Sequence, residues 1–158
     1  MLRMTDSSNT DHSFAPSAVI LLPFTVALHI AEEWFGGFAD WARLTLDLDI
    51  SAAQFLSTNL AGLVLFAIGA TFAYREPRAA WIGVSLTALV CLNTNLHTGL
   101  SVAVGVYSPG TITGLLLYIP MSVIIFRWAA THLSRGVFGG AIIFGIGIHA
   151  VATLSATL

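Results

Sequence analysis

Five apolar stretches, each close to the length of a bilayer-spanning helix, dominate the sequence. Lipid offers no partners to backbone N–H and C=O groups, so a span must satisfy them internally, and an α-helix of about 20 residues does so. Only 9% of the residues are charged, against roughly 25% in a soluble domain, so most of the exterior must face lipid. We therefore predict a single-domain, all-α integral membrane bundle with five transmembrane helices, over residues 17–39, 51–74, 79–106, 110–131 and 137–158.

The segments outside these stretches indicate how the chain crosses the membrane. Residues 1–16 are polar and are predicted to form an N-terminal tail, and residues 17–158 form the transmembrane domain. Arginine is enriched on the cytoplasmic side of membrane proteins. One side of the predicted bundle carries only Arg43, which predicts a cytoplasmic N-terminus and an extracytoplasmic C-terminus; the other side carries Arg3, Arg75, Arg78, Arg127 and Arg135.

Composition also excludes some classes of function and leaves others open. The chain has no lysine and a net charge of −2, so it lacks the basic surface that a nucleic-acid partner requires. Its single cysteine, Cys91, cannot form an internal disulfide or a thiolate metal site. Gly136 and Gly140 have a spacing typical of close helix packing, and the glycine-rich last helix would permit a homo-oligomer. Pro120 is expected to kink the fourth helix and open space for a ligand.

Three ionisable residues interrupt the first apolar stretch. One such group at the centre of a membrane helix costs roughly 2.5–3.5 kcal/mol, yet His29, Glu32 and Glu33 occur within five positions. Residues three and four apart lie on the same side of a helix, so both glutamates share a face with the histidine. Lipid does not tolerate such a face, and we expect it to point into the bundle.

Other predicted helices carry polar residues at a similar depth. At about 1.5 Å of rise per residue, they fall between the midplane and the outer boundary of the membrane. Asn93 and His97 share a face of the third helix, and His149 lies in the fifth. We expect a cavity in the outer half of the bundle, between helices one, three and five. Asn59 of the second helix and Tyr118 of the fourth are candidates for contacts to a substrate or to the ligating groups, although both residue types also serve simple helix packing.

The pattern His29-x-x-Glu32-Glu33, followed by Asn93-x-x-x-His97 and a late His149, resembles the HXXEE-motif family of small membrane proteins. The resemblance covers roughly residue 16 to the C-terminus. It implies a membrane setting and supports the choice of site residues. The family has no assigned activity, so the resemblance implies no reaction.

Histidines and carboxylates together suit a divalent metal ion such as zinc, iron or manganese. We predict that His29, His97 and His149 are ligands, with Glu33 or Glu32 as the fourth. The remaining glutamate is a candidate general base acting on metal-bound water, and Asn93 is a candidate to fix a histidine tautomer. Because the spans hold only two carboxylates, a mononuclear site is favoured.

These residues predict an intramembrane metal-dependent enzyme that acts on a lipid or other hydrophobic substrate, by hydrolysis or oxidation. One alternative is a metal-free acid/base isomerase or cyclase of an isoprenoid-like lipid, in which a buried glutamate donates a proton and a histidine accepts one. A proton- or ion-conducting membrane protein is another, and haem ligation by two histidines is a further one. The number of histidines distinguishes a metal site from acid/base catalysis, because metal binding explains why three are present, whereas acid/base catalysis needs only one or two.

Overall fold

The computed structural model describes residues 16–157, and five of its helices are long and apolar enough to cross a membrane. No strand occurs in this range, which confirms the predicted all-α bundle. Residues 1–15 of the predicted tail, with Arg3, lie outside the described residues. The elements are α1 Ala18–Phe35, α2 Phe38–Leu46, α3 Ala52–Arg75, η1 Pro77–Ala79, α4 Ala80–Val104, α5 Thr111–Thr113, η2 Gly114–Tyr118, α6 Ile119–His132 and α7 Arg135–Thr157.

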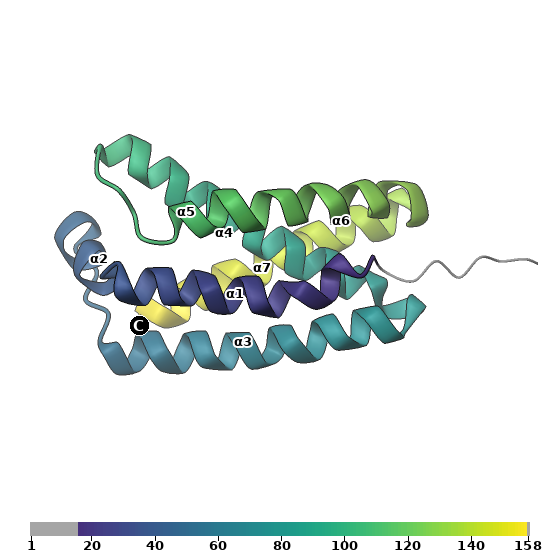
Figure 1. Ribbon diagram of the computed structural model, residues 1–158, viewed down its shortest axis with the longest axis horizontal. Coiled ribbons are helices and arrows are strands. Elements are labelled where there is room, and N and C mark those ends of the chain that lie inside the picture. Colours follow the sequence, from purple (N-terminus) through teal and green to yellow (C-terminus); the bar gives the residue numbers. More distant parts are fainter. Residues whose placement is uncertain (1–15, 158) are drawn as a thin grey trace, which may run out of the picture.

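The long helices lie roughly along one axis (Figure 1). Helices α1, α4 and α7 run toward the end of the bundle that holds α2, whereas α3 and the α5–η2–α6 segment run away from it. This alternation follows from the short connections, which reverse the chain after each span. As a result, residues late in α1, α4 and α7 lie at the same end of the molecule.

The prediction of one helix over residues 17–39 was wrong at its end, because the first span stops at Phe35. Gly37 has a φ of +73°, in the left-handed region that glycine adopts at little cost. A Cβ on Gly36 would lie 2.6 Å from the carbonyl oxygen of Glu32 and 2.8 Å from Cβ of Pro109, so the chain packs closely there. The segment from Asp40 onward, which was expected to be a loop, begins within helix α2.

Helix α2 is amphipathic and covers one end of the bundle. Trp41 and Ala42 are buried, whereas Arg43 and Asp40 form an exposed ion pair at 2.9 Å. Helix α3 begins with a capping box. The Ser51 hydroxyl accepts a bond from the Gln54 N–H, and the Gln54 side chain accepts one from the Ser51 N–H.

The fourth span contains a π-helical turn, η2, immediately before Pro120. Proline has no N–H to donate to the preceding turn, and π turns inside α-helices often occur at functional sites. Gly114 lets this turn approach α4, because a Cβ there would lie 3.0 Å from Oγ1 of Thr94. The turn also carries Tyr118 into the interior, where only 2% of its surface is exposed.

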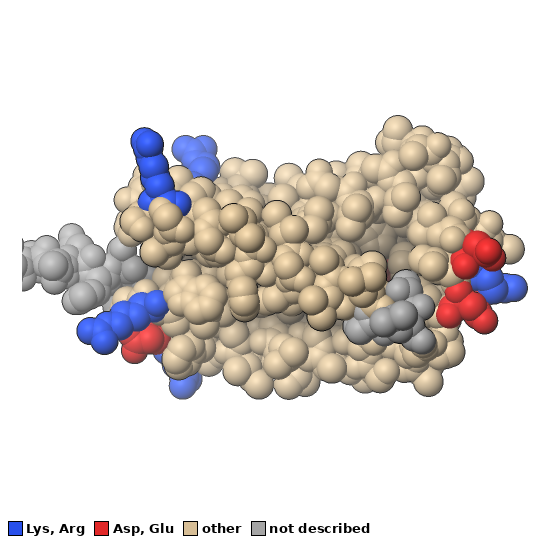
Figure 2. Space-filling view, turned by 180° about the vertical axis from the view of Figure 1, so that it is seen from behind, with Lys and Arg blue, Asp and Glu red and all other residues tan. Residues whose placement is uncertain are grey.

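The surface of the bundle has the character of a membrane protein. Large apolar side chains such as Phe24, Leu65 and Ile143 are exposed along the spans. Charged side chains gather at the two ends, and little charge shows between them on the face seen in Figure 2. The described arginines other than Arg43 belong to the end opposite α2, where α3 meets α4 and α6 meets α7.

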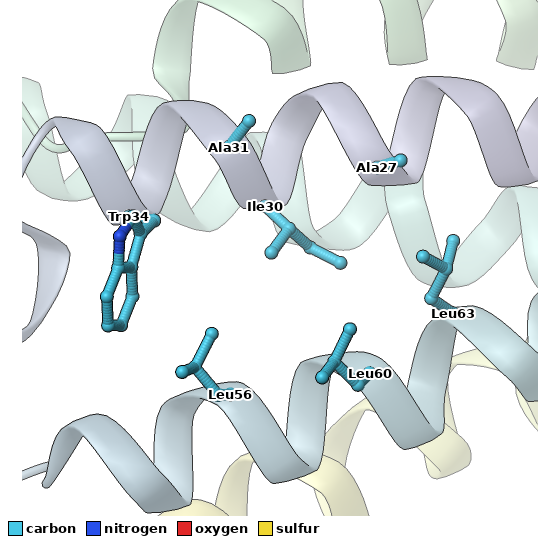
Figure 3. Close-up of a pocket in the computed structure, with 7 residues that line it drawn as sticks. All are labelled: Ala27, Ile30, Ala31, Trp34, Leu56, Leu60 and Leu63. Carbon is cyan, nitrogen blue, oxygen red and sulfur yellow. The ribbon is translucent and has the colours of Figure 1, made fainter.

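A shallow groove of about 230 Å³ runs between α1 and α3. Figure 3 shows its apolar lining, with Ile30 and Trp34 on α1 pointing toward Leu56 and Leu60 on α3. The residues that line the groove are all apolar, and none of the predicted site residues is among them.

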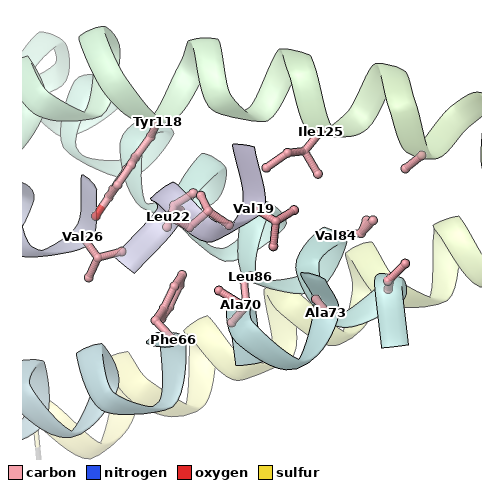
Figure 4. Packing of buried hydrophobic residues seen from close by; sticks show 14 residues of the cluster. Val19, Leu22, Val26, Phe66, Ala70, Ala73, Val84, Leu86, Tyr118 and Ile125 are labelled. Carbon is pink, nitrogen blue, oxygen red and sulfur yellow. The ribbon is translucent and has the colours of Figure 1, made fainter. Parts of the chain in front are cut away.

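The core lies toward the end opposite α2. Val19 and Leu22 of α1 pack with Phe66 of α3, Val84 of α4 and Ile125 of α6 (Figure 4). Helix α4 is the most buried span, and α7 packs along it.

The close contact between α4 and α7 occurs at Gly145, where a Cβ would meet the carbonyl oxygen of Ser85 at 2.2 Å. Gly136 and Gly140, where close packing was predicted, have no atom within 4 Å of an added Cβ in the described chain. Their expected contribution to an oligomer stays a prediction.

Candidate metal centre

Three of the predicted site residues lie together inside the bundle. His29 and Glu33 come from successive turns of α1, and His97 comes from α4. Oε1 of Glu33 lies 3.5 Å from Nε2 of His29 and 3.2 Å from Nε2 of His97. One donor atom from each residue lies within 4.8 Å of the others, and all three side chains are buried. Within residues 16–157 this is the one group of three or more such residues with metal-ligand spacing.

The two imidazoles are held at their other nitrogens by hydroxyl groups. Nδ1 of His29 lies 2.9 Å from Oγ1 of Thr113, and Nδ1 of His97 lies 2.9 Å from Oγ of Ser108. When Nδ1–H donates to a hydroxyl oxygen, the Nε2 lone pair is free to bind a ligand. Ser108 and Thr113 both lie in the segment that follows α4. The sequence did not predict that these two residues contact the histidines.

Gly110 lies directly against both histidines. Its φ is +104°, and a Cβ there would lie 2.8 Å from Cε1 of His29, 3.0 Å from Cε1 of His97 and 3.1 Å from Nε2 of His29. The backbone of the segment therefore covers the two rings, and the missing side chain leaves space beside the donor atoms. In the sequence, Gly110 was recognised only as the first residue of the fourth predicted span.

Aromatic rings complete the surroundings of the histidines. The ring of Tyr118 lies 4.8 Å from that of His29, which places this predicted residue at the site. The ring of Phe38 lies 5.5 Å from that of His97. Phe38 is the first residue of α2, and it was not predicted because the residues around it were expected to be the end of a span and a loop.

Glu32 lies outside this group, so of the two glutamates predicted as the alternative fourth ligand, Glu33 is the one placed with the histidines. Glu32 lies about 100° around α1 from Glu33, and its carboxylate accepts bonds from the N–H groups of Gly110, Ile112 and Thr113. It also accepts one from the hydroxyl of Tyr107. Burial, together with this bond to Glu32, raises the pKa of Tyr107 to about 12. Because it accepts bonds from Ile112 and Thr113, the Glu32 carboxylate lies at the N-terminal end of the fourth span, where the helix dipole favours a negative charge.

The other predicted site residues lie apart from the three-residue group. His149 is buried on α7 with Nδ1 3.0 Å from Oγ1 of Thr153. Its Nε2 and the Oδ1 of Asn93 are buried without a hydrogen-bond partner among the described residues. The amide of Asn59 donates to the carbonyl of Phe55 on its own helix, at 3.0 Å. The Asn59 amide therefore bonds to a carbonyl of its own helix, α3.

The donor set fits a divalent metal ion. With metal–ligand bonds of about 2.1 Å, two ligands of a tetrahedral site are about 3.4 Å apart, close to the 3.2 Å and 3.5 Å between Glu33 and the histidines. Nε2 of His29 is buried and lacks a hydrogen-bond partner in the described chain, which a bound cation would explain. Two histidines and a glutamate leave a coordination position open.

Replacing Gly110 with alanine should disturb the histidines as well as the backbone. The matched control is Gly105→Ala, because Gly105 also has a positive φ, +70°, but has no atom within 4 Å of an added Cβ. The control should lose roughly 1–2 kcal/mol of unfolding free energy from backbone strain alone. Gly110→Ala should lose about 1–3 kcal/mol more through overpacking, as measured by unfolding in detergent. Equal losses for the two variants would contradict the close packing of Gly110 on the rings.

Comparison with known proteins identifies a family and no activity. Residues 20–125 match the model of a family described as "Protein of unknown function with HXXEE motif". No curated protein and no solved structure matches the chain. The match includes His29, Glu33 and His97 but ends before His149, so it covers less than the predicted resemblance. Because it spans well over half of the sequence, the chain belongs to the HXXEE-motif family.

Proposed function

We propose that the protein is a membrane-embedded metalloenzyme in which His29, Glu33 and His97 hold one divalent ion and act on a lipid-soluble substrate. The observation that carries this proposal is the buried carboxylate of Glu33 with the Nε2 atoms of both histidines 3.2–3.5 Å away. Zinc, iron and manganese all suit two imidazoles and a carboxylate.

The charge of Glu33 argues for a cation at this place. An ionised carboxylate buried without a cationic partner is strongly unfavourable, and a span in lipid makes the cost greater. The contacts of Glu33 are two imidazoles that are themselves bound to neutral hydroxyl groups. A metal ion between the three side chains would neutralise the carboxylate and would use both Nε2 lone pairs.

A bound ion with an open position would supply Lewis-acid activation of water or of a substrate oxygen. The chain's own residues would then orient the substrate and move protons. His149 replaces Glu32 as the proposed proton carrier, because its Nε2 is buried without a hydrogen-bond partner among the described residues. Asn93, one turn before His97, keeps its predicted role of fixing a histidine tautomer.

A lipid-soluble substrate follows from the surroundings of the site. The three residues lie within spans whose exposed side chains are largely apolar. Phe38 and Tyr118 pack on the histidines, so an apolar molecule would find aromatic contacts beside the polar atoms. The reaction, whether hydrolysis or oxidation, depends on the ion and the substrate.

Elemental analysis of the purified full-length protein in detergent tests the metal site. We expect about one zinc, iron or manganese per chain, retained in the control His132→Ala, whose histidine is exposed near the end of α6. His29→Ala, His97→Ala and Glu33→Gln should each lose most of it, since each removes one of three ligands. His149→Ala should keep the metal. A wild-type protein without metal, even after reconstitution, would sink the proposal in favour of acid/base chemistry by Glu33 and the histidines.

Lipid extracts from cells producing the protein test the enzymatic part. Wild type and His132→Ala should deplete one lipid species and produce another, whereas Glu33→Gln should do neither. Mass spectrometry of the extracts measures both changes and identifies the substrate class. Identical extracts in all three cases would contradict an enzyme of membrane lipids, even if the metal were present.

We also propose that the end of the bundle opposite α2 faces the cytoplasm. Arg75, Arg78, Arg127 and Arg135 belong to that end, and arginine is enriched on the cytoplasmic side. The metal centre would then lie in the outer half of the membrane. A reporter that is active only outside the cytoplasm, fused after residue 158, should be active, and an inactive fusion in stable protein would reverse the orientation.

A further inference from the structure

We infer that Glu32, the first glutamate of the HxxEE string, is a positioning residue that sets the metal affinity of the site without touching the ion. It acts through the segment formed by residues 107–113, which we call the cover loop. This inference rests on the proposed metal site and assigns the two glutamates of the motif to separate tasks.

The carboxylate of Glu32 holds the cover loop at several points. Oε1 accepts bonds from the N–H groups of Gly110 at 2.9 Å and Ile112 at 3.0 Å, and Oε2 accepts one from Thr113 at 2.6 Å. The hydroxyl of Tyr107 donates to Oε1 as well. One charged side chain thus satisfies three backbone donors at the start of a helix, an arrangement that favours an anion and gives strong hydrogen bonds.

The cover loop in turn holds both proposed histidine ligands. Oγ1 of Thr113 bonds Nδ1 of His29, and Oγ of Ser108 bonds Nδ1 of His97, each at 2.9 Å. Between them, Gly110 packs against the Cε1 atoms of the two rings. Outer bonds of this kind fix the tautomer and the orientation of a ligating histidine. A displacement of the loop would therefore loosen two ligands together.

The substitution Glu32→Gln removes the negative charge of the side chain but keeps its size. The glutamine amide has one acceptor oxygen and an NH₂ group, and the NH₂ group would face N–H donors of the loop in place of the second carboxylate oxygen. We expect Glu32→Gln to release part of the cover loop while α1 stays intact. Glu33→Gln removes a ligand but leaves the loop contacts in place, so the two variants should differ in kind.

The experiment uses Co²⁺ as the probe with full-length protein in detergent. Glu33→Gln should abolish Co²⁺ binding, and the control Glu76→Gln, at an exposed position between α3 and η1, should bind as wild type does. Glu32→Gln should keep one site but bind about 10- to 100-fold more weakly, with a shifted visible spectrum. Hydrogen exchange of residues 107–113 should be faster in Glu32→Gln and unchanged in Glu33→Gln.

Two further variants keep the test informative if Glu32→Gln does not fold. Tyr107→Phe removes one of the donors to Glu32 and should weaken Co²⁺ binding by less than about tenfold. Thr113→Val removes the hydroxyl next to His29 but keeps the backbone N–H, so it should shift the Co²⁺ spectrum while the loop stays protected. Wild-type binding and spectra in both variants would overturn the inference.

The outcomes distinguish this inference from the proposed function. Wild-type affinity and spectrum in Glu32→Gln would overturn the positioning role and leave the metal site standing. Complete loss of binding in Glu32→Gln with unchanged loop exchange would make Glu32 a ligand and also overturn it. If wild type binds no Co²⁺, the metal site fails, and ¹⁵N spectra of the histidines decide the positioning role. Protonated Nδ1 in wild type and a mixture of tautomers in Glu32→Gln would support it, and identical spectra would reject it.

Discussion

The contact between the Glu33 carboxylate and two imidazoles is the interaction on which the rest of this structure depends. A carboxylate inside a membrane span is unfavourable unless it meets a partner that compensates its charge. The chain brings His29 to it from the preceding turn and His97 from another span. Because α1 and α4 run in the same direction, residues late in each helix reach the same depth. The alternating direction of the spans thus brings these three side chains together.

The polar groups around the proposed metal site form two sets that meet at the cover loop. The first set contains the three proposed ligands, and the second contains Glu32, Tyr107 and the hydroxyls of Ser108 and Thr113. Two glycines allow these segments to approach closely, because Gly110 packs on the histidine rings and Gly36 packs on Pro109. The aromatic side chains of Tyr118 and Phe38 pack against the two histidine rings as well. The site is thus built by local backbone freedom as much as by side-chain chemistry.

The sequence predicted the spans and the central residues because both have simple physical signatures. Apolar length predicts a span, and His29 with Glu33 at a separation of four predicts a shared face. The break at Gly36 and Gly37 was missed, since an apolar run does not reveal that Phe38 begins a second helix. The sequence left open which glutamate joins the histidines, because one turn of helix puts both near His29 and only the contacts with the cover loop distinguish them. The helix order also could not reveal that Ser108 and Thr113 reach the ring nitrogens.

The separation of the two glutamates changes how the family's motif is best understood. Glu33 is coupled to His29 and His97 by direct contact, whereas Glu32 is coupled to the backbone around Gly110 and to Tyr107. The two adjacent glutamates of the motif therefore contact different parts of the chain. Among relatives, a replacement at position 33 would have to be matched in α1 or α4, and a replacement at position 32 would have to be matched in the cover loop. The motif thus joins two contacts that reach the same pair of histidines, one directly and one through the cover loop.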